Sequence, residues 1–558
     1  MQKSERLFDL IHSMTKAEKR AFKLRAQRNG ERNRYIDLFD VIAAMPAYDE
    51  EELKSRVRDA GTRKNLRQAK HYLKNAVLRC LTELRVFQDS LRVADSMLST
   101  ASMLHERQMH DLEYEILCKA EKMARVNGNE MTALRSRMLQ MTVLPIIEND
   151  AEVLRASLDS SYEDMKRDLE RIRTMVDYRW VQSAIVILFD TIGTPRSERE
   201  LQEFHRIARH PSMLQARFLD NPQNAVMYYD AAYNYHMVMR NFAAAEQSSI
   251  LMLNAIKGND YYTIMRSRCL LRLAQAYSSM LDYEKFTHCW TDALFSEEGP
   301  PDKHLLDETH HFFDVFHIKL LSRMGRFKDA YTVYKRAPKN INSLALGKSE
   351  TAFSIYAYFY ACFGCGHYNE AFKWLQKITD DPSLTTRNDI AGFAHIAKLI
   401  THYELGDLSA MDYILRSTYR FLRSRQGIYQ VEELVLTFIS GLTGVRNSDE
   451  LLLHFRRALD KLRSIADDPM EDQILDLFEL QEWLQSRIER RPFADVVRES
   501  AAVQRARHMR EYEENMARML RPDGNIGLFD HLHSAQDVEA AMRSAGIDST
   551  PRPADASA

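Results

Sequence analysis

Apolar residues recur at the spacing of α-helices along most of the chain. Thr15 and Glu18 form a capping box, in which each side chain accepts from the other residue's backbone N–H, and this predicts a helix start. A second helix is predicted over 34–45, because Pro46 ends the pattern. A long helix is predicted over 62–87 from one apolar stripe with a period near 3.6, made of Leu66, Ala69, Leu73, Ala76, Val77, Cys80, Leu84 and Phe87.

The same periodicity continues beyond this region. It predicts helices over 94–126, 130–143, 150–178 and 197–208, and two further periodic segments over 451–465 and 474–488. The chain has only 18 glycines and 14 prolines among 558 residues, which is about half the ordinary share of these helix breakers. Both observations predict an all-α fold.

A short phrase recurs five times in the middle of the chain. In each copy a helix ends, a tight turn carries an aromatic residue or leucine, and a small or apolar residue follows three positions later. The turn residues are Phe242, Tyr283, Phe327, Tyr368 and Leu408, so the phrase returns at a nearly constant interval. Such a period is typical of repeat proteins, in which each helical pair buries one face against its neighbours.

The five phrases resemble the turn of the tetratricopeptide repeat. Gly325, Gly366 and Gly406 occupy the family's glycine position in three copies, and Ala245, Ala330 and Ala371 occupy its alanine position in three. The first two copies lack the glycine, the fifth has Met411 for alanine, and the period is longer than is usual for the family. The resemblance covers about residues 226–425. It implies an α-solenoid of stacked antiparallel helical hairpins, tetratricopeptide-like with long repeats.

The first 90 residues carry a different resemblance. The segments SERLFDLIHSMTKAEKRAFKL and KHYLKNAVLRCL resemble the start of an uncharacterised family of bacterial helical-repeat proteins, common in the Bacteroidetes and their relatives. No activity comes with this resemblance. We expect five regions along the chain: a basic N-terminal helical region (1–90), helical hairpins (91–225), tetratricopeptide-like repeats (226–425), C-terminal helices (426–545) and a disordered tail (546–558).

Charge and cysteine content narrow the class of protein. The formal net charge of −2 gives no global sign of a nucleic-acid-binding protein, although residues 1–90 hold 20 Lys and Arg against 13 Asp and Glu. Six cysteines in so long a chain do not resemble a disulfide framework. Neither a secretory signal nor an apolar run of about 18–20 residues is found. We therefore expect a cytoplasmic protein without a membrane segment.

Patterns of catalytic residues favour a protein that is not an enzyme. The sequence contains no phosphate-binding loop, dinucleotide-binding fingerprint or nucleophile elbow. His105 and His110 resemble part of a metalloprotease helix, but a spacing of five places them about 140° apart on one helix. Cys362 and Cys365 form a lone pair near a predicted helix end, with no second pair to complete a zinc site. We expect neither a metal site nor a cofactor.

The tetratricopeptide resemblance also implies a partner-binding groove. In that family the first helix of each repeat lines the concave face. Carried over to this chain, the positions include Asn234, Arg268, Gln275, Lys319, Arg323, Tyr356 and Tyr360. Such basic, amide and aromatic groups suit an extended or helical peptide that carries carboxylates. The alternative is that these side chains pack against a neighbouring helix.

A second candidate surface is a basic ridge on the helix predicted over 62–87. It consists of Arg63, Arg67, Lys70 and Lys74, which fall within about 60° of one another on that helix. The ridge is either a site for phosphate or an acidic protein, or a solvated charged face.

Two functional hypotheses follow from these surfaces. The first is a non-enzymatic scaffold or adaptor that binds a partner protein or peptide in the concave groove. The alternative is a nucleic-acid-linked regulator that uses the basic N-terminal helices, with binding that depends strongly on salt.

Overall fold

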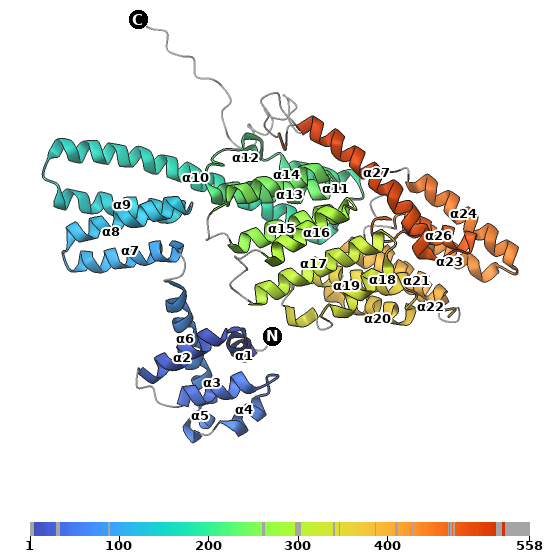
Figure 1. Cartoon of the computed structure of the whole chain (residues 1–558), viewed down its shortest axis with the longest axis horizontal. Helices are drawn as coiled ribbons and strands as arrows, with labels where there is room; N and C mark the ends of the chain where they lie inside the picture. Colours follow the sequence, from blue (N-terminus) through green and yellow to red (C-terminus); the bar gives the residue numbers. More distant parts are fainter. Residues whose placement is uncertain are drawn as a thin grey trace, which may run out of the picture. The chain divides into compact units, whose positions relative to one another are not determined.

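The fold is helical throughout the part of the chain that the structure, a computed structural model, describes (Figure 1). All regular elements within the described residues are α-helices or short 3-10 helices, which confirms the predicted all-α class. The described residues are 5–28, 34–57, 59–86, 90–258, 263–295, 303–338, 341–344, 346–384, 387–407, 411–425, 428–466, 468, 471, 475–519 and 527–529. Leu408 and the tail at 546–558 lie outside these ranges.

The chain forms two compact units. The first comprises residues 1–172 and the second residues 173–558, apart from the short segments 259–261 and 301–305, which group with the first. The helices of the first unit are α1 (Glu5–Ser13), α2 (Lys16–Arg28), α3 (Arg34–Ala44), α4 (Glu50–Arg56), α5 (Ala60–Lys64), α6 (Leu66–Val86), α7 (Ser90–Glu106), α8 (His110–Val126) and α9 (Glu130–Ile147). The boundary falls within the 42-residue helix α10 (Ala151–Ile192).

At the start of the first unit, the helices agree closely with the predictions from local sequence patterns. The Thr15 N–H donates to Glu18 Oε2 at 2.8 Å, and the Glu18 N–H donates to Thr15 Oγ1 at 3.2 Å, so the predicted capping box begins α2. The apolar stripe of α6 packs on α1 and α3 around a core that includes Leu7, Phe39 and Leu73. The prediction of a single helix over 62–87 is wrong at its N-terminal end. The backbone leaves helical geometry at Asn65, so this segment is divided into α5 and α6.

The second unit contains the repeated phrases and the C-terminal helices. After α11 (Glu198–Ala208) and α12 (Pro211–Gln215), its helices are α13 (Pro222–Val238), α14 (Phe242–Ala255), α15 (Thr263–Ser279), α16 (Tyr283–Phe295), α17 (Lys303–Arg323), α18 (Phe327–Arg336), α19 (Lys348–Gly364), α20 (Tyr368–Thr379), α21 (Asn388–Glu404), α22 (Met411–Ser424), α23 (Gln430–Gly441), α24 (Ser448–Ala466), α26 (Leu480–Glu489) and α27 (Phe493–Met519). Short 3-10 helices lie at η2 (Ile341–Leu344), η3 (Pro382–Leu384) and η4 (Leu442–Gly444). Helices that follow one another pack together, for example α13 on α14 and α19 on α20.

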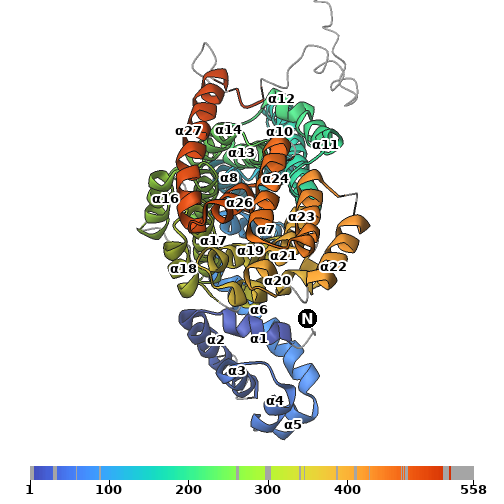
Figure 2. The same cartoon turned by 90° about the vertical axis from the view of Figure 1, so that its right-hand side faces the viewer.

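The repeated phrases share one backbone turn (Figure 2 shows the helices that they join). Phe242, Tyr283, Phe327 and Tyr368 each begin the second helix of a pair, as the phrase predicts. In all five copies the residue two positions before the aromatic or leucine has a positive φ, at Arg240, Leu281, Gly325, Gly366 and Gly406. The following residue donates its N–H to the carbonyl five positions earlier, at 2.8–3.2 Å. This is the Schellman pattern of a helix C-terminus, and it is kept even where glycine is absent.

Two of these glycines differ in their surroundings and form a matched pair for mutation. A Cβ at Gly325 would lie 2.5 Å from the carbonyl oxygen of Ala494 and 2.6 Å from the amide nitrogen of Arg498, both in α27. A Cβ at Gly366 would meet nothing within 4 Å. Gly366→Ala therefore adds only left-handed backbone strain, about 1–2 kcal/mol. Gly325→Ala adds the same strain and a steric conflict with α27, about 1–3 kcal/mol more.

We expect the free energy of unfolding, measured in urea by circular dichroism, to fall further for Gly325→Ala than for Gly366→Ala. Equal losses in the two variants would show that α27 does not pack against this turn.

A helix that crosses a bilayer needs about 20 predominantly apolar residues. Among the described residues, none of the helices combines the length and the apolar character needed to do so.

Candidate functional site

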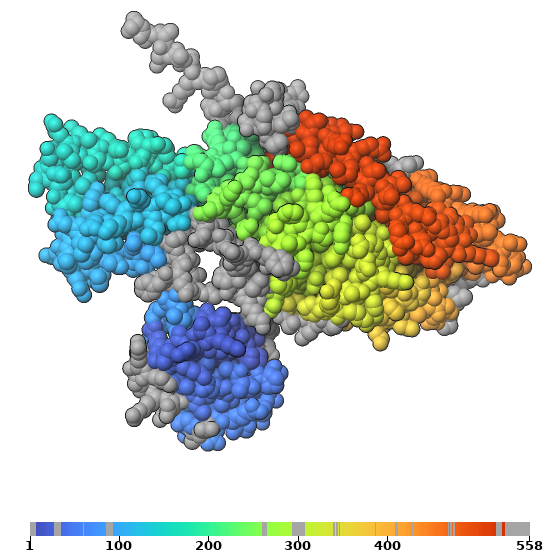
Figure 3. Space-filling model, viewed as in Figure 1, coloured from blue at the N-terminus to red at the C-terminus, as the bar shows by residue number. Residues whose placement is uncertain are grey.

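The C-terminal segment packs against the helices that carry the predicted groove residues. α27 lies against α14 and α26 and runs across the face of the second unit shown in Figure 3, where it is the red helix. Phe478, just before α26, is fully buried with its ring 5.4 Å from Tyr360 and 5.2 Å from Phe363. Phe493, at the start of α27, stacks on Phe327 at 5.4 Å. The chain itself therefore covers this part of α18 and α19.

Arg323 is the centre of the polar contacts beneath this segment. Its Nη2 donates to Asp476 Oδ1 at 2.8 Å and to Gln504 Oε1 at 3.2 Å, and its Nε donates to Glu479 Oε1 at 3.3 Å. Arg240, in the first of the repeated turns, adds a second cation 3.1 Å from Asp476. Arg323 and Glu479 are both almost completely buried. Buried charges need such partners, because desolvation of an unpaired charge is very costly.

The two carboxyl groups respond differently to this environment. Burial alone would raise the pKa of Asp476, but Arg240 and Arg323 outweigh it and hold that pKa well below its usual range. Burial raises the pKa of Glu479 to about 7, and Arg323 only partly opposes this. Asp476 is thus an ion-paired carboxylate, whereas Glu479 exchanges its proton near neutral pH.

The remaining groove residues near this network are also placed inside the fold. The hydroxyl of Tyr360 donates to the Glu479 carboxylate. Tyr356 is buried, and its hydroxyl has no hydrogen-bond partner among the described residues. Lys319 is half-buried with its Nζ 5.8 Å from the centre of the Phe353 ring. Burial, with a smaller effect from Arg323, lowers the pKa of Lys319 to about 8.

The other three predicted groove residues do not join this network. Arg268 is exposed on α15. Gln275 accepts a hydrogen bond from the Tyr233 hydroxyl at 3.0 Å. Asn234 donates to the backbone carbonyl of Asp230 at 2.7 Å. The structure thus brings together only Lys319, Arg323, Tyr356 and Tyr360 of the seven.

The expectation of an open groove at Arg323, Tyr356 and Tyr360 is corrected by their burial. Arg323 and Tyr360 contact carboxylates, and Tyr360 also contacts an aromatic ring, which is the chemistry expected of a ligand, but the groups come from the same chain. Asp476, Phe478 and Glu479 were missed because they lie far away in sequence, in a segment without the repeated phrase. The only sequence signal for Asp476 and Glu479 was that their negative charge complements the positive charge of Lys319 and Arg323.

A second buried ion cluster closes another part of the second unit. Arg196, just before α11, donates to Glu471 at 2.8 Å and to Glu432 at 3.4 Å, and its guanidinium lies 3.5 Å from the centre of the Tyr429 ring. Arg425 also pairs with Glu432, at 3.1 Å. The cluster therefore ties the start of this unit to helices near its C-terminal end.

The predicted basic ridge is divided between two helices. Arg63 is on α5, whereas Arg67, Lys70 and Lys74 are on α6, so the common helical face expected for all four is wrong. Lys70 is half-buried and donates to the Tyr48 hydroxyl at 2.9 Å and to Glu50 Oε2 at 3.2 Å. Lys70 is thus held within the first unit by its own neighbours.

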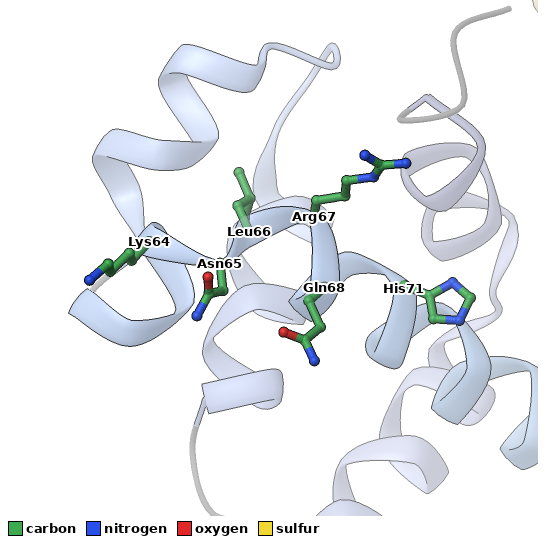
Figure 4. Close-up of a pocket in the computed structure, with 6 residues that line it drawn as sticks. All are labelled: Lys64, Asn65, Leu66, Arg67, Gln68 and His71. Carbon is green, nitrogen blue, oxygen red and sulfur yellow. The ribbon is translucent and has the colours of Figure 1, made fainter.

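Two shallow basic depressions lie in the same part of the chain. The first, of about 430 Å³, surrounds the junction of α5 and α6, where the side chains of Lys64 and Arg67 extend in different directions (Figure 4). Its other lining residues are Asn65, Leu66, Gln68 and His71. The second, of about 410 Å³, is on α2 and is lined by Lys16, Lys19, Arg20, Lys23 and Leu24.

Sequence reasoning missed an exposed apolar stripe on the part of α10 that belongs to the second unit. Val176, Trp180 and Ile187 are each 50–65% exposed. Their positions along α10 place them within about 40° of one another on the helix. The same periodicity was present in the sequence, but it does not distinguish a buried stripe from an exposed one.

Comparison of the chain with protein-family models, with curated proteins and with solved structures finds no match in any of the three. The two resemblances described above therefore rest on the residues of this chain alone.

Proposed function

We propose that this chain is a non-enzymatic scaffold of the α-solenoid type that binds a partner protein through the apolar stripe of α10. The stripe is the observation that carries the proposal. Three large apolar side chains aligned along about 16 Å of one helix are unusual for surface positions without a partner. The repeated turns support the solenoid, since they pair successive helices at a nearly constant period.

The inner face of the repeats is a poorer docking surface than the resemblance implied. A partner that reached Arg323, Tyr356 and Tyr360 would have to remove Phe478 from a fully buried position. Burial of one phenylalanine side chain alone contributes about 1.5–3 kcal/mol, and α26 would move with it. We therefore assign the partner surface to α10 and a structural role to the groove residues.

The stripe fits an amphipathic helix with basic residues beside its apolar face. Spacings of seven and four positions match those at which one helix presents side chains to another. Two partly exposed carboxylates flank the stripe, Asp177 and Asp190, about 60° and 80° from Trp180 on opposite sides. Arg173 and Arg179 supply opposite charges nearby. The proposed occupant is a helix of a partner protein with lysine or arginine beside its apolar face.

The proposal is tested with a synthetic amphipathic peptide that has leucine at heptad positions and lysine beside them. We expect the Val176→Glu/Ile187→Glu double variant to bind it about thirtyfold more weakly than the parent in calorimetry. Each of these side chains should lose about 1 kcal/mol of burial, since both are only partly exposed. Trp180 lies between them, so its fluorescence provides a second measurement.

Val503→Glu is the matched control, because Val503 is at least as exposed on α27 but lies outside the stripe. It should bind the peptide like the parent. Equal affinity of the parent, control and double variant, or no binding to the parent, would contradict the assignment to α10.

The basic depressions on α2 and at the α5–α6 junction favour a second candidate function, which is binding of nucleic acid by the N-terminal helices. This function is distinguished from the first by a steep fall of affinity with salt.

A further inference from the structure

The turn between α7 and α8 brings two imidazole rings to one carboxylate. Helix α7 ends at Glu106 and α8 begins at His110, and Gln108 between them has a φ of 57°. The expectation of one continuous helix over 94–126 is therefore wrong. The inference that His105 and His110 point in widely different directions assumed this single helix. It no longer applies, because the two residues lie on different helices.

The three polar groups lie at distances suited to metal ligands. Nδ1 of His105 is 3.0 Å from Oε2 and 3.2 Å from Oε1 of Glu113, and Nδ1 of His110 is 3.1 Å from Oε2. One ligand atom from each residue falls within 4.8 Å of the others. In a tetrahedral site with bonds of about 2.0–2.1 Å, neighbouring ligand atoms are about 3.3 Å apart. Only a small adjustment would admit an ion between them.

Burial and charge make the site attractive to a cation. The Glu113 side chain is 4% exposed, so its carboxylate needs a positive partner inside the fold. In contrast, the His105 side chain is 48% exposed and leaves a path for an ion from solvent. Other carboxylates among the described residues are also buried beside cations, for example Glu432, Glu471 and Glu479, but none of these three is grouped with two imidazoles. Among the described residues, this is the one group of three such ligands.

We propose that His105, His110 and Glu113 bind a divalent transition-metal ion of the Zn²⁺ type. Two imidazole nitrogens and one carboxylate oxygen are ligands that Zn²⁺ prefers, and three protein ligands leave one position for water. Without metal, each imidazole must carry a proton on Nδ1 to donate to Glu113. On metal binding each neutral imidazole would carry its proton on Nε2 instead, which leaves the Nδ1 lone pair to coordinate the ion. The bound ion then joins the end of α7 to the first turn of α8.

The proposal does not depend on the partner surface of α10. It is tested on the full-length chain, freed of metal by a chelator and titrated with Zn²⁺ alone in calorimetry. We expect one equivalent to bind to the parent and His105→Ala to bind it at least about 100-fold more weakly. Loss of groups that merely orient metal ligands already costs about 10–100-fold, and His105 is a ligand itself. Co²⁺ should give the visible absorption of a tetrahedral site in the parent only.

His288→Ala is the control, because His288 is exposed and pairs with Asp292 at 3.2 Å on a single helix without a third ligand. It should bind Zn²⁺ like the parent. Glu113→Gln should also lose binding. If that variant does not fold, His105→Ala still decides the question, since its ring is half-exposed. Unchanged Zn²⁺ affinity in His105→Ala, or no stoichiometric binding to the parent, would overturn the site.

Discussion

Replacement of Arg323 by alanine is expected to cost about 3–5 kcal/mol of the free energy of unfolding of the second unit. The substitution leaves the buried Glu479 without its cation and removes one of the two cations beside Asp476. Tyr360 would still donate to Glu479, but a neutral hydroxyl does not compensate a buried charge. Urea denaturation followed by circular dichroism at pH 7.5 measures this loss.

Arg326→Ala is the matched control for this experiment. Arg326 lies three residues away and donates to Asp329 at 2.7 Å, but its side chain is much more exposed than that of Arg323. Its loss should cost at most about 1 kcal/mol, as for other surface ion pairs. In addition, Glu479→Gln should recover part of the loss in the Arg323→Ala background, because it removes the uncompensated charge. Similar losses for Arg323→Ala and Arg326→Ala would contradict the buried network.

Acidification from pH 7.5 to 5.5 is expected to destabilise the second unit by about 3 kcal/mol. Burial lowers the pKa of four histidines to about 4, at His311, His317, His395 and His508. Unfolding returns these pKa values to about 6.5. Between pH 6.5 and pH 4 the unfolded chain therefore binds more protons than the folded chain, and it is stabilised relative to the folded chain as the pH falls. At pH 5.5 each histidine then costs about 1.3 kcal/mol, or about 5 kcal/mol together.

Two carboxyl groups act in the opposite direction. The pKa of Glu479 is raised to about 7 and that of Asp314 to about 6, in both cases mainly by burial. Because these two pKa values are higher in the folded chain, protonation of the two groups stabilises the folded chain, and this stabilisation is complete below their pKa values in the unfolded chain. It is lost as the pH rises through their pKa values in the folded chain, so acidification to pH 5.5 restores most of it. The gain is about 2.6 kcal/mol, which is smaller than the cost from the histidines. The net effect is therefore destabilisation.

The measurement is the free energy of unfolding in urea at both pH values. His508→Gln should reduce the difference between them by about 1.3 kcal/mol. A parent protein that is equally stable at pH 7.5 and 5.5 would contradict the neutral, buried state of these histidines.

Sequence reasoning predicted features that depend on neighbours within a few turns of helix. The capping box at Thr15 and the helix starts at Phe327 and Tyr368 depend on short-range patterns, and the structure confirms them. The turn between α7 and α8 was missed although it is local. It contains neither glycine nor proline, and Gln108 takes up a left-handed conformation that its residue type does not signal.

The groove residues illustrate the limit for contacts distant in sequence. Their chemical character indicated carboxylate ligands, and Arg323 and Tyr360 do contact carboxylates. The sequence could not indicate that these carboxylates are Asp476 and Glu479, because helical periodicity identifies an apolar or polar face but not the segment that covers it. The resemblance to repeats implied an open face, and the cover comes from outside the repeated region.

The position of the buried ion clusters along the chain has a consequence for synthesis on the ribosome. Most repeat arrays can fold locally as each unit emerges, because their contacts are between neighbours. Here Arg196 and Arg323 are translated well before Glu471, Asp476 and Glu479, so these contacts form only after at least 153 further residues have been synthesised. The two arginines and the Phe327 and Phe363 rings therefore lack these contacts until Glu471, Phe478 and Phe493 have left the exit tunnel. The helices α26 and α27 thus complete this part of the interior of the second unit after, and not during, the synthesis of the helices that they cover.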